Sequence, residues 1–228
     1  GYKTILAGIG ASNLAAWKAW YDLRREDYQA DLMAEVGFFG YTPRPSDPFI
    51  FNFRNIPTCT MLTDILTVLG SMVGAESNRA IGVLGAGQVD RSGNINSTKL
   101  PEHGLFLVGS GGACDVALGA REVLVTVAQD RLRTPERVSY ITAPGRHVRT
   151  LVTTMGVFEK PPGEEEFVLT AVLPPLHGDE REAVARIRSR CGWEPRVAGT
   201  LRRAEPPRRD ELHDIRIFDP RRYFLGEG

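Results

Sequence analysis

The stretch Asp31-Leu32-Met33-Ala34-Glu35-Val36-Gly37-Phe38-Phe39-Gly40 joins a short apolar run to a carboxylate and two glycines. We interpret residues 31–34 as a β-strand, because the apolar run is short and glycines bound it. Glu35 then falls at the carboxyl end of this strand. Ligands bind at this edge of parallel sheets, so Glu35 is a candidate functional residue. The alternative is a solvated or helix-capping carboxylate with no part in chemistry.

Short apolar runs and helical patterns alternate along most of the chain on either side of this stretch. We expect strands at residues 4–9, 31–34, 80–84, 105–108, 123–128, 138–142, 151–158 and 167–173. We expect helices after Ser12 or Asn13 as cap, after Thr60 as cap, near residues 113–120 and at residues 179–191, with residues 212–218 packing back on the body of the protein.

This alternation predicts an α/β fold with an open, mainly parallel sheet that helices cover on both faces. No internal repeat or linker divides the chain, so we treat residues 1–228 as one domain. The chain starts at Gly1 inside the first expected strand, which is consistent with a missing N-terminal segment.

The composition argues against several classes of protein. Basic and acidic residues number 28 each, so no overall charge draws the chain to nucleic acid or to an anionic membrane. No apolar run approaches the roughly 20 residues of a membrane-spanning helix. The 3 cysteines are far apart and the 4 histidines show no ligand spacing, so we expect neither a disulfide framework nor a metal site. These features favour the cytoplasm.

Two further glycine-rich stretches follow expected strands. They are Gly85-Ala86-Gly87-Gln88-Val89-Asp90-Arg91-Ser92-Gly93-Asn94-Ile95-Asn96-Ser97-Thr98 and Gly109-Ser110-Gly111-Gly112-Ala113-Cys114-Asp115. The second departs from the spacing of a dinucleotide fingerprint, and the first lacks the Lys-Ser/Thr pair of a P-loop. Tight packing of a strand against a helix is the alternative reading of both. Because all three stretches follow strands, we expect them to converge at one edge of the sheet.

Together, the three stretches resemble the β subunit of the family I coenzyme A (CoA) transferases, nearest to the glutaconate CoA-transferase branch. The resemblance covers nearly the whole chain, with weaker matches at residues 156–158, 191–193 and 219–220. Residues 85–98 are its most specific part, because the match there is long and ungapped. The resemblance implies a homologous α subunit that completes the active site, in a heterodimer that assembles further to a heterotetramer or larger. It also implies CoA as a substrate, with no permanently bound cofactor.

The resemblance also implies roles for individual residues. The glutamate of the family's Glu-x-Gly motif is the nucleophile, which puts that role on Glu35. Matching positions make the Gln88 amide and the backbone N–H near Gly111 or Gly112 the donors to the oxyanion. The neighbouring residues of the same turn are expected to bind CoA: Gly109, Ser110 and Ala113. The implied reaction passes through an acyl-glutamyl anhydride and a glutamyl-CoA thioester.

Three residues are expected to line the substrate pocket: Phe38, Phe39 and Arg54. The two aromatic residues stand where many relatives have smaller side chains, so we expect an acyl group that is bulkier or more apolar than a small dicarboxylate. Arg54 is a candidate partner for a distal carboxylate of the substrate, and an exposed arginine with no such role is the alternative.

A second departure is Thr153-Thr154-Met155, where the family commonly has Thr-Asp-Leu. The competing function is a hydrolase, decarboxylase or C–C lyase that acts on CoA thioesters with Glu35 as general base. Relatives with such activities typically lack the glutamate, so its presence here favours transfer. A non-enzymatic structural subunit is the third reading, and the intact glycine and Gln88 motifs disfavour it.

Overall fold

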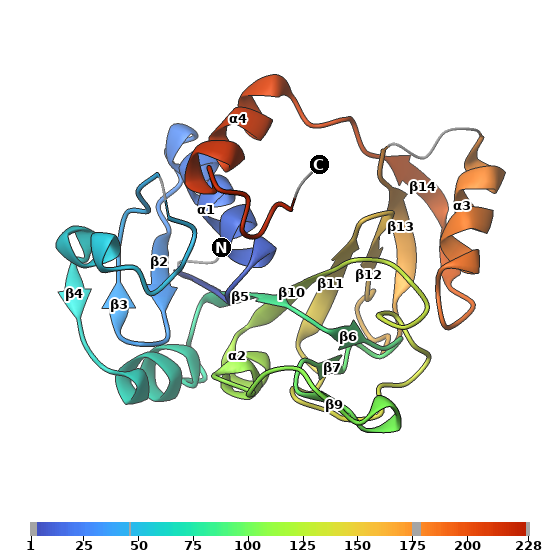
Figure 1. Ribbon diagram of the computed structural model, residues 1–228, viewed down its shortest axis with the longest axis horizontal. Helices are drawn as coiled ribbons and strands as arrows, with labels where there is room; N and C mark the ends of the chain where they lie inside the picture. Colours follow the sequence, from blue (N-terminus) through green and yellow to red (C-terminus); the bar gives the residue numbers. More distant parts are fainter. Residues whose placement is uncertain (1–3, 46, 175–178, 227–228) are drawn as a thin grey trace. The chain divides into compact units, whose positions relative to one another are not determined.

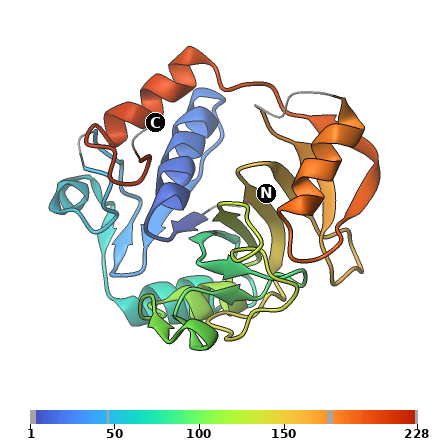
Figure 2. The same ribbon diagram turned by 45° about the vertical axis from the view of Figure 1, so that its right-hand side comes forward.

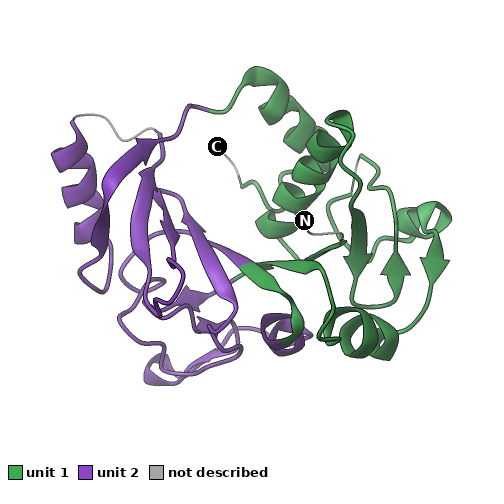
Figure 3. Cartoon of the chain, turned by 180° about the vertical axis from the view of Figure 1, so that it is seen from behind, with its two compact units in different colours: residues 1–85, 119–123, 207–228 green, residues 86–118, 124–206 purple. Residues whose placement is uncertain are grey.

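A computed structural model describes residues 4–45, 47–174 and 179–226 (Figure 1). The chain divides into two compact units (Figure 3). Unit 1 comprises residues 1–85, 119–123 and 207–228, and unit 2 comprises residues 86–118 and 124–206. Each unit therefore collects segments that are distant in the sequence. The expectation of one domain over residues 1–228 stays a prediction.

Unit 1 is built on a sheet whose centre is parallel. Its strands are β1 (Thr4–Ala7), β2 (Asp31–Ala34), β3 (Phe38–Phe39), β4 (Met61–Leu62) and β5 (Ala80–Gly85). Strand β1 pairs in parallel with β2 on one side and with β5 on the other. Strands β3 and β4 extend the sheet beyond β2 as antiparallel neighbours. The strand predicted at residues 31–34 is confirmed.

Aromatic side chains join helix α1 (Ala11–Arg25) to helix α4 (Arg209–Phe218) within unit 1. Trp17 on α1 is fully buried, and its ring centroid lies 5.5 Å from that of Phe218. The ring of Tyr21 lies 5.6 Å from the same phenylalanine. Two views show α4 beside α1 (Figures 1 and 2). The prediction that residues 212–218 pack back is confirmed.

We expect Phe218→Ala to lower the free energy of unfolding of unit 1 by about 3 kcal/mol, because the lost ring leaves a cavity between Trp17 and Tyr21. Urea unfolding followed by tryptophan fluorescence measures this, since Trp17 and Trp20 lie on α1. Tyr223→Ala is the control, because this aromatic side chain of the same terminal segment is 65% exposed. Equal effects of the two substitutions would contradict the packing of α4 on α1.

Unit 2 holds the remaining larger strands. They are β10 (Glu122–Val127, whose first two residues belong to unit 1), β11 (Val148–Thr153), β12 (Gly156–Glu159), β13 (Val168–Val172) and β14 (Arg196–Arg203). Strand β12 pairs antiparallel with β11 and β13, whereas β13 and β14 are parallel. Helix α3 (Glu180–Ser189) makes the crossover between the two parallel strands. Asp179 caps it by accepting a hydrogen bond from the N–H of Glu182 at 2.9 Å.

Shorter elements complete the two units. In unit 1 they are the 3-10 helix η1 (Phe53–Thr58) and the π-helix η2 (Leu66–Val73). In unit 2 they are the hairpin β6 (Gln88–Val89) with β7 (Ile95–Asn96), the hairpin β8 (Lys99–Leu100) with β9 (Leu105–Phe106), the 3-10 helix η3 (Pro101–His103), and α2 (Ala113–Gly119), whose last residue belongs to unit 1.

Two predicted strands of unit 2 are wrong. Residues 138–142 form no strand, and Ile95 makes only an isolated bridge with Ala143. Residues 151–158 form parts of two strands, because Thr153 turns the chain. Its Oγ1 accepts hydrogen bonds from the N–H groups of Met155 at 3.1 Å and Gly156 at 2.9 Å. Such local side-chain bonds give the backbone an alternative to the sheet. Strand β14 was not predicted.

Both predicted caps in unit 1 are also wrong. Helix α1 follows Gly10 without a side-chain cap, while Asn13 donates instead to the carbonyl of Pro48 at 2.8 Å. Thr60 precedes strand β4, and its hydroxyl donates to the carbonyl of Phe39 at 3.2 Å. The helix that follows begins only at Leu66. Competing hydrogen bonds thus moved both helix starts.

In the described part of the chain, every helix is too short or too polar to cross a membrane. The cysteines Cys59, Cys114 and Cys191 are unpaired.

Candidate functional site

Glu35 occupies the first position of the three-residue loop that joins β2 to β3. Ala34 pairs with Phe38 across this hairpin, and the N–H of Gly37 donates to the carbonyl of Ala34 at 3.0 Å. Gly37 has φ 109°, and a Cβ there would lie 2.0 Å from the carbonyl oxygen of Thr63. The loop therefore requires glycine two residues after Glu35. The Glu35 side chain itself is half-buried.

Phe38 and Phe39 form the short middle strand β3 and are half-buried. Phe38 pairs with Ala34 and Leu62, and Phe39 pairs with Met33 and Met61. Successive side chains of a strand point to opposite faces, so the two phenyl rings face different sides of the sheet. Their part in substrate choice stays a prediction.

Arg54 lies in the 3-10 helix η1, on the exposed loop after β3. Its N–H donates to the Oδ1 of Asn52 at 2.8 Å, and its Nη1 donates to the carbonyl of Pro45 at 3.5 Å. The guanidinium is thus in contact with its own loop. Pairing with a substrate carboxylate stays a prediction.

Gln88 is a buried residue of unit 2, with an exposure of 4%. Its Oε1 accepts from Nδ2 of Asn96 at 2.8 Å, and its Nε2 donates to the carbonyl of Leu132 at 2.8 Å. A side-chain amide carries two N–H donors. At most one of them is therefore left for a substrate oxyanion. The sequence did not show that Asn96 and Leu132 hold the amide in this way.

The glycine turn before α2 is exposed at Gly109, Ser110 and Gly111, and becomes buried at Gly112. Gly111 has φ 51°, and the N–H of Ala113 donates to the carbonyl of Ser110 at 3.2 Å. These bonds close the turn on itself before the short helix begins.

The second and third glycine stretches lie together in unit 2. The N–H of Leu107 donates to the carbonyl of Thr98 at 2.7 Å. A Cβ at Gly87 would lie 2.9 Å from the side chain of Leu107. Glu35 belongs to unit 1. The convergence of all three stretches in one site therefore stays a prediction.

The departure at Thr154 keeps a hydrogen-bond acceptor at that position. The N–H of Gln129 donates to Thr154 Oγ1 at 3.1 Å, while Thr153 Oγ1 donates to Gln129 Oε1 at 2.6 Å. Gln129 is 4% exposed, so these bonds satisfy buried polar groups. The change at Thr154 therefore bears on the β11–β12 turn.

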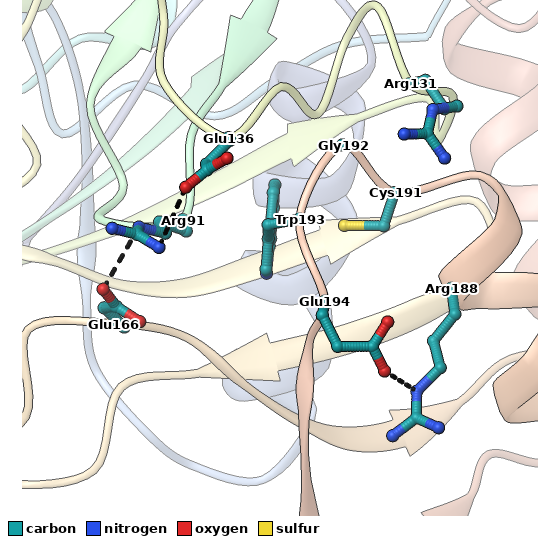
Figure 4. A pocket seen from close by; sticks show the side chains of 9 residues that line it. All are labelled: Arg91, Arg131, Glu136, Glu166, Arg188, Cys191, Gly192, Trp193 and Glu194. Atoms are coloured by element: carbon teal, nitrogen blue, oxygen red, sulfur yellow. Dashed lines mark ion pairs between the residues drawn. The ribbon is translucent and has the colours of Figure 1, made fainter.

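Unit 2 also contains a cavity of about 420 Å³, which the sequence analysis did not locate (Figure 4). It is lined by Arg91, Arg131, Glu136, Glu166, Arg188, Cys191, Gly192, Trp193 and Glu194. Arg91 forms ion pairs of 3.2 Å with both Glu136 and Glu166. Arg188 pairs with Glu194 at 2.7 Å. Three arginines and three glutamates leave the lining neutral, so it has no strong preference for anions.

The only sequence signal for this cavity is the weaker family match at residues 191–193, which form part of its wall. Burial raises the pKa of the Cys191 thiol, so the thiol is a poor nucleophile. None of the residues that the sequence assigned to catalysis or substrate lines the cavity. In the described residues, no group of three or more His, Cys, Asp or Glu side chains is placed to hold a metal ion.

No family model matches the chain. One of the two subunits named for a 3-oxoadipate CoA-transferase from Pseudomonas knackmussii is 30% identical to it over 159 residues, which cover 62% of this chain and 59% of that protein. The match thus spans less than two thirds of the relative's length. Among solved structures, the glutaconate coenzyme A-transferase from Acidaminococcus fermentans has a TM-score of 0.83 at 19% identity, and the match covers 100% of this chain and 92% of that one. The chain is a homologue of the family I CoA-transferases.

The family resemblance and the α/β fold predicted from the sequence are thereby confirmed. This CoA-transferase homologue also shares its fold with the decarboxylase AibA/AibB, with a TM-score of 0.74 at 22% identity over 98% of this chain and 90% of that one. One fold therefore carries both transferase and decarboxylase activities in its relatives. Function has to be argued from the residues of the site.

Proposed function

We propose that this chain is the β subunit of a CoA-transferase, which moves CoA between an acyl-CoA and a carboxylic acid. The observation that carries the proposal is the placement of Glu35 at the start of a hairpin loop that only glycine at position 37 allows. The similarity to a subunit of the 3-oxoadipate CoA-transferase supports it.

In this proposal, Glu35 is the nucleophile. Its carboxylate attacks the thioester carbonyl, the C–S bond breaks, and CoA leaves as a thiolate from an acyl-glutamyl anhydride. The thiolate then attacks the carbonyl carbon of Glu35, which releases the first carboxylate and leaves a glutamyl-CoA thioester. The acceptor carboxylate reverses both steps and departs as the new acyl-CoA. This order of events predicts ping-pong kinetics.

Each addition places negative charge on a carbonyl oxygen. The remaining N–H of the Gln88 amide and the backbone N–H near Gly111 or Gly112 are the proposed donors. Each such donor contributes about 3 kcal/mol to transition-state stabilisation. Other residues retain their proposed binding roles: Gly109, Ser110 and Ala113 toward CoA, and Phe38, Phe39 and Arg54 toward the acyl group.

A homologous α subunit is the proposed partner, in a heterodimer or a larger assembly. The relative from Pseudomonas knackmussii is named as one subunit of its enzyme, which supports a companion chain. The three unpaired cysteines support a reducing compartment, the cytoplasm.

The decisive experiment traps the covalent intermediate. The complex with its companion subunit is incubated with acyl-CoA alone, and the peptide that contains Glu35 is examined by mass spectrometry. We expect CoA attached to Glu35, and a reduced product at the same residue after borohydride treatment. Consumption of the thioester without any covalent species on this peptide would exclude the glutamyl intermediate.

The second candidate is a hydrolase, decarboxylase or C–C lyase in which Glu35 acts as general base. The shared fold with the decarboxylase AibA/AibB supports keeping it. Kinetics distinguish the two functions, because a transferase requires an acceptor acid, whereas a hydrolase turns over with water alone. A decarboxylase or lyase would release carbon dioxide or a cleaved carbon fragment without an acceptor.

A further inference from the structure

The hairpin that carries Gln88 is too small to hold its own conformation. Strands β6 and β7 pair only through Gln88 with Asn96 and Val89 with Ile95. An isolated two-stranded hairpin is marginally stable in water, and this one is shorter than most. The position of the Gln88 amide therefore depends on contacts that hold the hairpin from outside.

The turn at the tip of this hairpin, residues 90–94, is organised around a buried carboxylate. Asp90 is 3% exposed, and its Oδ1 accepts from the N–H groups of Ser92 and Asn94, both at 3.0 Å. Its Oδ2 accepts from Asn94 Nδ2 at 3.1 Å and from the N–H of Val138 at 3.3 Å. These bonds use the donors of the turn and leave the carbonyl of Ser92 to be satisfied from elsewhere.

Lys160, the residue after strand β12, supplies that bond. Its side chain is buried, with an exposure of 8%, and its Nζ donates to the carbonyls of Ser92 at 2.5 Å and Gly145 at 2.8 Å. The N–H of Gly145 in turn donates to Asn94 Oδ1 at 3.0 Å. The ammonium also lies 5.2 Å from the ring centroid of Phe167. One buried cation thus ties the turn to two separate segments of unit 2.

We propose that Lys160 is a positioning residue for Gln88: its ammonium holds the turn at residues 90–94 and, through the hairpin, the amide that the proposed reaction uses. This inference rests on the proposed function, since Gln88 acts there as an oxyanion donor. Lys160 itself does not touch the substrate. Its role is exerted through the backbone of the hairpin.

The charge on Lys160 is sensitive to pH. Burial lowers its pKa to about 8, and Arg149 on β11 acts in the same direction, while Asp90 and Glu165 oppose the shift. The neutral amine still has two N–H donors, but hydrogen bonds from a charged donor are roughly twice as strong. We therefore expect the hairpin to loosen, and kcat to fall, as the pH rises through about 8.

Global unfolding would not cause this fall. The unfolded chain has a lysine pKa of about 10.4, so between the two values the unfolded state binds more protons than the folded state. Lys160 then makes the free energy of unfolding rise with pH over this interval. A loss of activity there reports a local change in the site.

The first test moves the pKa of Lys160 without touching the lysine. Arg149→Gln removes a nearby positive charge, so the alkaline inflection of kcat in the complex should shift to higher pH. Arg186→Gln, an exposed arginine on α3 in the same unit, is the control and should leave the inflection unchanged. An inflection that Arg149→Gln does not move would overturn the proposal.

The second test removes the clamp. In Lys160→Met, hydrogen–deuterium exchange at pH 7 should increase at the amides of residues 90–94. The value of kcat should fall by about ten- to a hundredfold with KM for acyl-CoA unchanged, as for a slightly misplaced catalytic group. Lys99→Met is the control, since that side chain is exposed over the ring of Tyr140. Unchanged exchange at residues 90–94 would contradict the clamp.

The outcomes separate the two proposals. Absence of transfer in the unaltered complex would overturn the proposed function alone, because hydrogen exchange reports the clamp without any turnover. If Lys160→Met fails to fold, the Arg149→Gln inflection still decides.

Discussion

Glu35→Gln should abolish CoA transfer while the protein keeps its fold. Glutamine has nearly the shape of glutamate, and the hairpin bonds of Gly37 and Phe38 do not involve the side chain at position 35. An uncharged amide cannot form the anhydride, so we expect kcat/KM to fall by at least about a thousandfold. Steady-state kinetics of the complex measures the loss, and circular dichroism checks the fold.

Two further variants make this result specific. Glu76→Gln, an exposed carboxylate elsewhere in unit 1, should retain full activity. Glu35→Asp retracts the carboxylate by one methylene and should still cost about a hundredfold, because a nucleophile tolerates little displacement. A general base that acts through a water molecule would tolerate aspartate better. Full activity in Glu35→Gln would exclude the nucleophile assignment.

The sequence predicted the elements of this fold where local chemistry and tertiary structure agree. Strand β2 has the predicted bounds, because glycines end it and its apolar residues are buried. Asp179 starts α3 as expected, since its side chain can bond the first turn without help from another segment. Prediction failed where distant groups compete, as at Asn13, whose amide bonds Pro48.

Strand β14 illustrates a second limit. Its sequence alternates little and none of its residues is buried, so periodicity gives no signal. Pairing with β13 defines it instead. Hydrogen bonding to a partner strand is a non-local property that a single stretch of sequence does not carry.

The candidate site shows the same division. The residue types at Glu35, Gly37 and Gln88 could be identified from the sequence, because each belongs to a short motif. Two features could not: the restriction of the Gln88 amide by Asn96 and Leu132, and the buried contact of Lys160 with Ser92. Lys160 lies 68 residues from Ser92 in the chain, and an isolated lysine after a strand carries no local signal.

Gly37→Ala should destabilise unit 1 by about 4 kcal/mol and remove transfer activity. The new Cβ would lie 2.0 Å from the carbonyl oxygen of Thr63 and 2.5 Å from its carbonyl carbon, both backbone atoms with little freedom to yield. Either β4 separates from β3 or the loop at residues 35–37 changes shape. Both outcomes displace Glu35. Urea unfolding followed by tryptophan fluorescence and kinetics of the complex measure the two effects.

Gly10→Ala separates the clash from backbone strain. Gly10 has φ 112°, close to the φ of 109° at Gly37, but a Cβ there meets nothing within 4 Å. Strain alone should then cost about 1–3 kcal/mol at both positions. Only Gly37→Ala adds the contact with Thr63, so the excess cost of that variant measures how closely β4 approaches the loop. Equal costs at the two glycines would mean that this approach does not hold Glu35 in place, and that the hairpin alone positions the nucleophile.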